Sequence, residues 1–208
     1  MRLLLLAAGL AYPVLAQLTI EPAGPCNAEG VSDTVKATLA ADGYRVQDGG
    51  APFVEVWPVK SVATAQPSEQ PRGSDFPMIP VNALLGVIRY HKAGGDFRGQ
   101  PIQPGVYTLR FNLQPEDGDH QGASPRRDHA LLAPASADQN AGAALTFEQQ
   151  VAASKKASGT QHPSVLFLQQ VDSGGKFGAV EASHGRQALQ IKTGSVGFGL
   201  IIVGKAEE

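Results

Sequence analysis

Residues 105–113 read Gly-Val-Tyr-Thr-Leu-Arg-Phe-Asn-Leu, and this stretch decides the fold class. Large apolar side chains stand at every second position from Tyr107 to Leu113, and Thr108, Arg110 and Asn112 stand between them. A period of two is that of a β-strand whose two faces differ. The pattern therefore predicts a strand with its apolar face in the core and its polar face in water, as in an antiparallel sheet.

Similar short apolar runs occur along the rest of the chain. The 24 glycines and 15 prolines fall between these runs and do not form one linker. Further strands are expected at 44–46, 53–59, 84–90, 129–132, 164–169, 188–192 and 196–203, with a hairpin turn at residues 48–50. The last run is apolar on both faces, which predicts a place near the middle of a sheet. Together the runs predict a mostly β protein, specifically an antiparallel β-sandwich of immunoglobulin-like or transthyretin-like type.

One or two short surface helices accompany the strands in this prediction. Ser32 is a suitable N-cap for a helix that ends near residue 41, before Gly43. Thr146 and Gln149 have the spacing of a capping box, and Gly159 ends the second helix.

The strand entry at residues 102–109, Ile-Gln-Pro-Gly-Val-Tyr-Thr-Leu, resembles that of many secreted bacterial β-sandwiches of transthyretin-like or carboxypeptidase-regulatory type. The whole chain is also similar to exported bacterial proteins of no known function. The resemblance implies a sandwich fold and supplies no catalytic residue.

The first sixteen residues have the order of an export signal. Arg2 is the positive residue, residues 3–10 are apolar, and Val14-Leu15-Ala16 precedes the expected cleavage site before Gln17. We therefore expect a signal peptide at 1–16, a single domain at 17–208, and a periplasmic or extracellular location. No later run is long enough to predict a transmembrane segment in the mature chain.

Charge and cysteine content limit the partners. The net charge is −2, or −3 once Arg2 is removed with the signal, and no basic cluster is present, so nucleic acid is not an expected partner. Cys26 is the only cysteine, which excludes an intramolecular disulfide and favours a free thiol.

No nucleophile, phosphate-loop or zinc motif occurs, so the sequence predicts no catalytic residue and no organic cofactor. The one constellation with metal-ligating chemistry is the stretch 116–129. Its candidate ligands for a divalent ion are Asp117, Asp119, His120, Asp128 and His129. The alternative is a solvated polar loop that protrudes from one end of the sheet.

Two functions from different classes remain. The first is an exported, non-catalytic module that binds a partner protein, a surface polymer or a small ligand. The second is a metal-binding protein or metal-dependent enzyme that uses the 116–129 loop.

Overall fold

The computed structural model describes residues 18–66, 71–116, 126–171, 173–183 and 185–204. Its strands are β1 (Thr19–Gly24), β2 (Gly43–Asp48), β3 (Ala51–Pro58), β4 (Leu84–Tyr90), β5 (Gly94–Gly95), β6 (Pro101–Ile102), β7 (Gly105–Leu113), β8 (Asp128–Pro134), β9 (Val165–Gln169), β10 (Val180–Ser183), β11 (Arg186–Thr193) and β12 (Val196–Val203). The helices are α1 (Asp33–Lys36) and α2 (Phe147–Ser158), with a 3-10 turn η1 (Ala135–Ala137).

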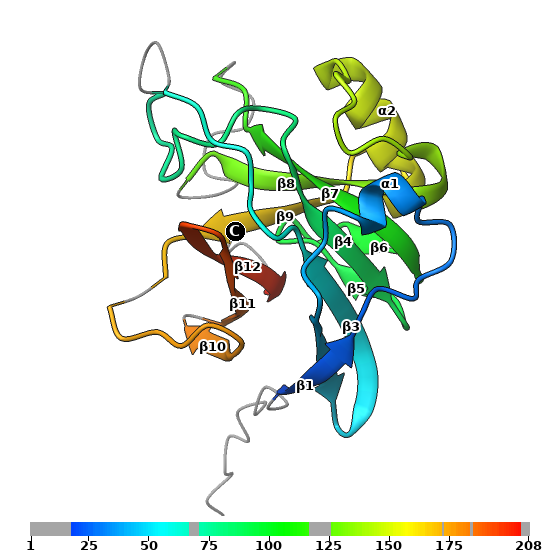
Figure 1. The fold of residues 1–208 in the computed structure, drawn as a ribbon, viewed down its shortest axis with the longest axis vertical. Coiled ribbons are helices and arrows are strands. Elements are labelled where there is room, and N and C mark those ends of the chain that lie inside the picture. The colour runs from blue at the N-terminus through cyan, green and yellow to red at the C-terminus, as the bar shows by residue number, and fades with distance from the viewer. Residues whose placement is uncertain (1–17, 67–70, 117–125, 172, 184, 205–208) are drawn as a thin grey trace, which may run out of the picture.

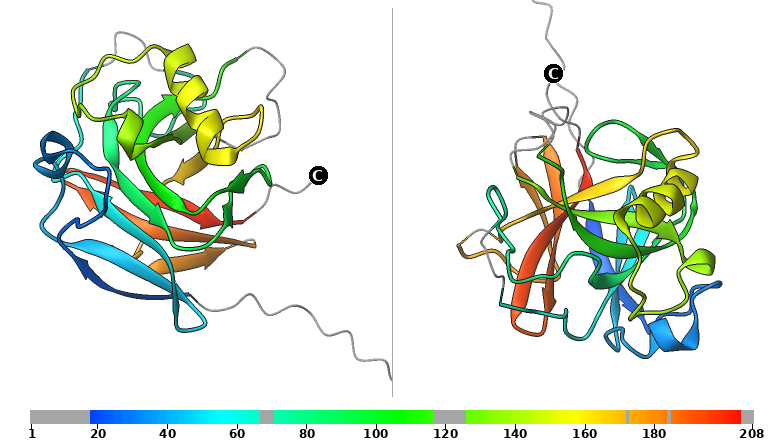
Figure 2. Two further views of the ribbon diagram at one scale, coloured as in Figure 1. Left: turned by 90° about the vertical axis from the view of Figure 1, so that its right-hand side faces the viewer. Right: turned by 90° about the horizontal axis from the view of Figure 1, so that it is seen from above.

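Ten strands form one antiparallel sheet in the order β1-β2-β3-β4-β7-β8-β9-β12-β11-β10. The sheet curls into a nearly closed barrel (Figures 1 and 2), and β5 and β6 form a separate small hairpin. The expected mostly β, antiparallel fold with two short helices is confirmed. The expected sandwich is not confirmed, because these ten strands belong to one continuous sheet and not to two stacked ones.

The hairpin between β2 and β3 follows from its turn residues. Gly49 and Gly50 have φ of 60° and 81°, a backbone region that glycine enters without a Cβ penalty. The barrel has its seam between the two edge strands, β1 and β10. At this seam Gly178, just before β10, lies close enough to the Tyr44 ring of β2 that a Cβ would be 3.3 Å from it.

The inside of the barrel is filled by side chains. On β7 the inward positions are Tyr107, Leu109 and Phe111, which are 5%, 2% and 0% exposed, as the alternation predicted. They belong to the main apolar cluster, to which strands β3, β4 and β12 also contribute. Trp57 of β3 is fully buried and donates its indole N–H to the Gly24 carbonyl.

The outer face of β7 is buried as well, and the expectation that it faces water is wrong. Thr108, Arg110 and Asn112 are 0%, 2% and 1% exposed. The Arg110 guanidinium donates to both carboxylate oxygens of Asp138, at 2.6 and 2.8 Å, and Thr108 Oγ1 donates to the same carboxylate at 2.6 Å. The polar groups of Thr108 and Arg110 therefore find their partners in the segment that follows β8 and not in solvent.

Helix α2 covers part of this outer face (Figure 2). Its capping box is formed by Thr146 and Gln149, and Gly159 ends it with φ of 67°, as predicted. Its buried residues are Gln150, Ser154, Ala157 and Ser158, whereas Phe147 is 39% exposed. The buried stripe of α2 is therefore made of polar and small side chains. The amide of Asn112 on β7 donates to the Gln150 side chain, which gives this polar stripe its partner in the sheet.

Helix α1 is shorter than the expected helix. Ser32 caps it by accepting a hydrogen bond from Val35 N, and the helical residues end at Lys36. Val35 is fully buried in the main cluster and holds this N-terminal segment against the barrel.

Candidate functional site

Asp128 does not project into solvent as the sequence suggested. It is the first residue of β8 and is fully buried. Its carboxylate accepts hydrogen bonds from Ser74 Oγ at 2.6 Å, from Asp75 N at 2.8 Å and from Phe76 N at 3.3 Å. Because the carboxylate is enclosed by these donors, its role in this structure is to fix the turn at residues 74–76.

His129 is also buried, at 5% exposed, on the outer face of β8. Its ring lies 5.9 Å from the Phe167 ring, and its Nδ1 is 3.1 Å from the Arg127 carbonyl. The other three candidate ligands, Asp117, Asp119 and His120, lie outside the described residues. Within the described part of the chain, no group of three His, Cys, Asp or Glu side chains is placed to hold a metal ion.

A carboxylate surrounded by cations lies on the outer face of β2, β3 and β4. Glu55, 2% exposed, is 2.8 Å from Arg45 Nε, 2.9 Å from an Arg89 nitrogen and 3.0 Å from His91 Nε2. Burial alone would raise the pKa of Glu55, but hydrogen bonds from Arg45 and His91 and the charge of Arg89 lower it below its ordinary value. Both carboxylate oxygens are occupied, so this cluster ties three strands together and presents no acid to a substrate.

Cys26 lies near this cluster as a free, half-buried thiol. Burial raises its pKa above the ordinary value. A raised pKa disfavours the nucleophilic thiolate.

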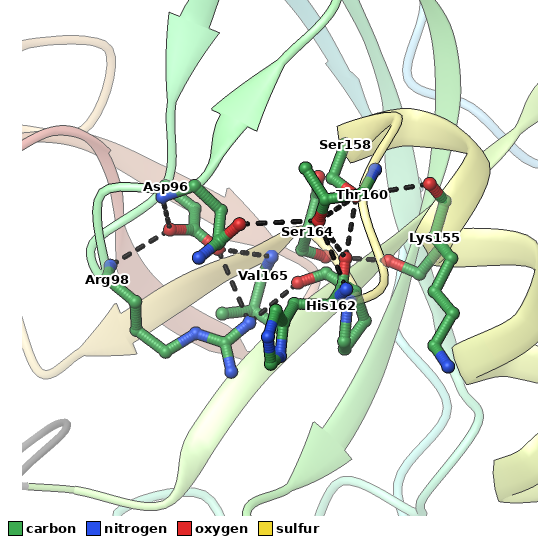
Figure 3. Close-up of polar contacts among 11 residues, drawn as sticks. Asp96, Arg98, Lys155, Ser158, Thr160, His162, Ser164 and Val165 are labelled. Atoms are coloured by element: carbon green, nitrogen blue, oxygen red, sulfur yellow. Dashed lines mark hydrogen bonds and ion pairs between the residues drawn. The ribbon is translucent and has the colours of Figure 1, made fainter.

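A polar network joins the β5–β6 hairpin, the end of α2 and the start of β9 (Figure 3). Asp96 accepts from Arg98 N at 2.9 Å, from Gln100 N at 2.8 Å and from Val165 N at 3.3 Å, and burial raises its pKa. Ser158 Oγ donates at 2.6 Å to the main-chain carbonyl of His162. This contact does not use the imidazole, so Ser158 and His162 are not a nucleophile–base pair. The network instead holds the hairpin, the helix end and the strand together.

The described residues also line two open depressions of similar size. One has a volume of about 410 Å³ and lies between residues 59–63, 80–84 and 141–144. Its lining has neither a charged nor an aromatic side chain. Asn82, with φ of 72°, belongs to a turn in which Ala83 N donates to the Pro80 carbonyl, a position where asparagine is favoured. A structural explanation therefore accounts for its unusual backbone.

The second depression, which we call the end groove, has a volume of about 390 Å³. It lies where the loop before β4, the chain after β9 and the start of β12 meet. Its lining residues are Asp75, Phe76, Met78, Gln170, Val171, Phe177, Ser195, Val196 and Gly197. Met78 and Phe177 are 38% and 44% exposed, and they are two of the four large hydrophobic side chains exposed in the described part of the chain. An exposed apolar pair in one concavity is typical of a binding site.

Neighbouring residues hold the end groove in shape. The buried Asp128 carboxylate fixes Asp75 and Phe76, and the Phe76 ring packs edge-on against Phe198 at 6.2 Å. Elsewhere in the lining, the Phe177 ring lies directly on Gly197, where an added Cβ would be 2.7 Å from the ring. The groove is therefore formed before any ligand binds, which lowers the entropy cost of binding.

Sequence reasoning did not find this groove, and it placed Asp128 in a loop. Met78 lies in a proline-rich stretch and Phe177 in a glycine-rich one, and neither stretch has a periodic pattern. The one available signal was a large apolar residue within each polar loop.

No protein-family model, curated protein or solved structure matches this chain. No helix of the described residues has both the length and the apolar character needed to cross a membrane.

Proposed function

We propose that this protein is an exported, non-catalytic binding module that holds its ligand in the end groove. The observation that carries the proposal is that two exposed large apolar side chains, Met78 and Phe177, line one preformed concavity. Methionine adapts to differently shaped apolar partners, and phenylalanine supplies a flat contact surface.

The polar clusters described above favour binding over catalysis. Glu55, Asp96, Asp128 and Asp138 each have several hydrogen-bond donors from the protein itself. A general acid or base needs a free position within hydrogen-bond reach of a substrate. These carboxylates are already engaged in holding strands and turns together.

Export is part of the same proposal. It rests on the order of charged, apolar and small residues in 1–16 and on the resemblance of residues 102–109 to the strand entry of secreted transthyretin-like sandwiches. A periplasmic or extracellular location suits a module whose task is to bind.

A ligand-observed NMR screen of small aromatic and aliphatic molecules against the protein tests the proposal. The test variant replaces Met78 and Phe177 with serine, and the matched control replaces Val81 and Phe147, the other two exposed large hydrophobics in the described residues. We expect molecules that bind the wild type and the control and lose most of their binding to the test variant. Equal binding to both variants, or no binding molecule at all, would contradict the proposal.

A further inference from the structure

The end groove follows a sheet edge that is only partly paired. Strand β12 pairs with β11 over its whole length, but its pairing with β9 begins at Gly199, opposite Gln169. The residues before Gly199 have no strand partner on the β9 side within the described part of the chain. The chain that follows β9 leaves the sheet and loops outward before β10 (Figure 1).

The alternation of hydrogen bonds places Gly197 at this open edge. Thr193 and Val196 pair across the two-residue turn between β11 and β12, so their main-chain groups face each other. Successive residues of an antiparallel strand direct their main-chain N–H and C=O groups to opposite edges. The main-chain groups of Gly197 and Gly199 therefore both point to the β9 side. Gly199 has Gln169 opposite it there, whereas Gly197 faces the end groove.

We propose that the end groove binds an extended peptide segment of a partner protein by strand addition at Gly197. This inference rests on the proposed function and names its ligand class. The Gly197 N–H and C=O pair with the peptide main chain, and a large apolar side chain of the peptide contacts Phe177 and Met78. Strand addition of this kind takes affinity from main-chain hydrogen bonds and specificity from side-chain contacts.

Charge around the groove favours an acidic segment. Asp75 is the one charged residue of its described lining, and it is paired with Arg126 Nε at 3.2 Å. The Arg126 side chain is 53% exposed, and the ammonium of Lys192 lies 5.7 Å from the Phe177 ring centre. Asp75 is already paired with Arg126, and Lys192 places a cation beside the Phe177 ring, so a peptide with glutamate next to its apolar residue is complementary to that lysine.

The experiment uses a capped synthetic peptide in which phenylalanine alternates with glutamate. Two further peptides carry N-methyl groups, one at every phenylalanine and the other at every glutamate. Since main-chain groups alternate in direction, only one methylated peptide loses the bond to Gly197. We expect that peptide to bind about tenfold more weakly or worse, and the other to bind like the parent.

Two additional measurements make the result specific. In ¹⁵N spectra of the protein, the Gly197 amide should shift on adding the parent peptide. A version with lysine in place of glutamate should bind several-fold more weakly, and the difference should shrink as salt is raised. These tests change the peptide and leave the protein intact, so misfolding cannot produce the result.

The outcomes separate the two proposals. Strand addition would be overturned if small molecules bind through Phe177 and Met78 but the peptide does not bind, or if neither methylation changes its binding. The proposed function would stand in that case. Self-association of the protein that protects the Gly197 amide without peptide would identify a second copy as the occupant and overturn the partner assignment. No binding of any probe would overturn both proposals.

Discussion

Replacing Arg110 with methionine removes a buried guanidinium from the outer face of β7. In the wild type this group donates to both oxygens of Asp138 and to the carbonyls of Asn82 and Asn140. Methionine keeps most of the apolar volume of the arginine stem, so little packing is lost. What remains is a buried Asp138 carboxylate whose only side-chain donor among these groups is Thr108 Oγ1.

The expected cost follows from that uncompensated charge. Removing one partner of a buried ion pair costs about 3–5 kcal/mol, because the remaining charge stays out of water. For a domain of about this size, each kcal/mol corresponds to roughly 2–4 °C in melting temperature. The Arg110→Met variant should therefore melt about 6–20 °C lower than the wild type.

Urea unfolding and thermal melts of four proteins provide the assay: the wild type, Arg110→Met, Asp138→Leu and the double variant. The double variant should be more stable than Arg110→Met alone, because no charge is left buried. The reasoning would be refuted if Arg110→Met cost less than about 1 kcal/mol, or if the stability changes of the two single variants simply added. Either result would mean that this face of β7 contacts solvent.

Three further predictions concern other described features and the chain start. Asp128→Ala should lower the free energy of unfolding by about 3 kcal/mol in urea titrations, because Ser74 Oγ and the Asp75 N–H lose their acceptor and the Phe76 N–H keeps only Ser74 Oγ. A change within about 0.5 kcal/mol, the scatter of surface substitutions, would contradict this. The pKa of Glu55 is lowered from 4.5, so its stabilisation is complete above that pH and is lost as pH falls through the lower folded-state value. Between about pH 7 and about pH 3, the free energy of unfolding measured in urea should therefore fall less for Glu55→Gln than for the wild type. The same pH dependence in both proteins would contradict this prediction. Mass spectrometry of the exported protein should find an N-terminus at Gln17, whereas a chain that retains Met1 would exclude the signal peptide.

Most of the strands could be read from the sequence because their signals are local. The expected strands at 84–90, 105–113 and 196–203 have the observed bounds, and β12 lies inside the sheet between β9 and β11 as its two apolar faces indicated. The hairpin at residues 48–50 and the capping box of α2 depend on neighbouring residues alone. Strands β1 and β10 were not predicted, since as edge strands they carry no clear alternation.

The errors have one physical source, which is pairing between residues distant in sequence. Arg110 looks solvent-facing until Asp138 is placed beside it, and Asp128 looks like a loop acid until residues 74–76 supply its donors. The closure of ten strands into a barrel is likewise set by long-range register and not by any local pattern. The end groove arises from three segments between residues 75 and 197, so no single motif could indicate it.

The seam of the barrel has a consequence for local unfolding. Among the described residues, strands β1 and β10 each have one hydrogen-bonded neighbour, whereas β7 has two and is buried on both faces. Amide protons on the free edges of β1 and β10 should therefore exchange with deuterium first, and those of β7 last. Opening at the seam separates the Tyr44 ring from Gly178 while the wall formed by β4, β7 and β8 keeps its shape. The barrel is thus expected to open locally along the seam between β1 and β10, while the opposite wall stays rigid.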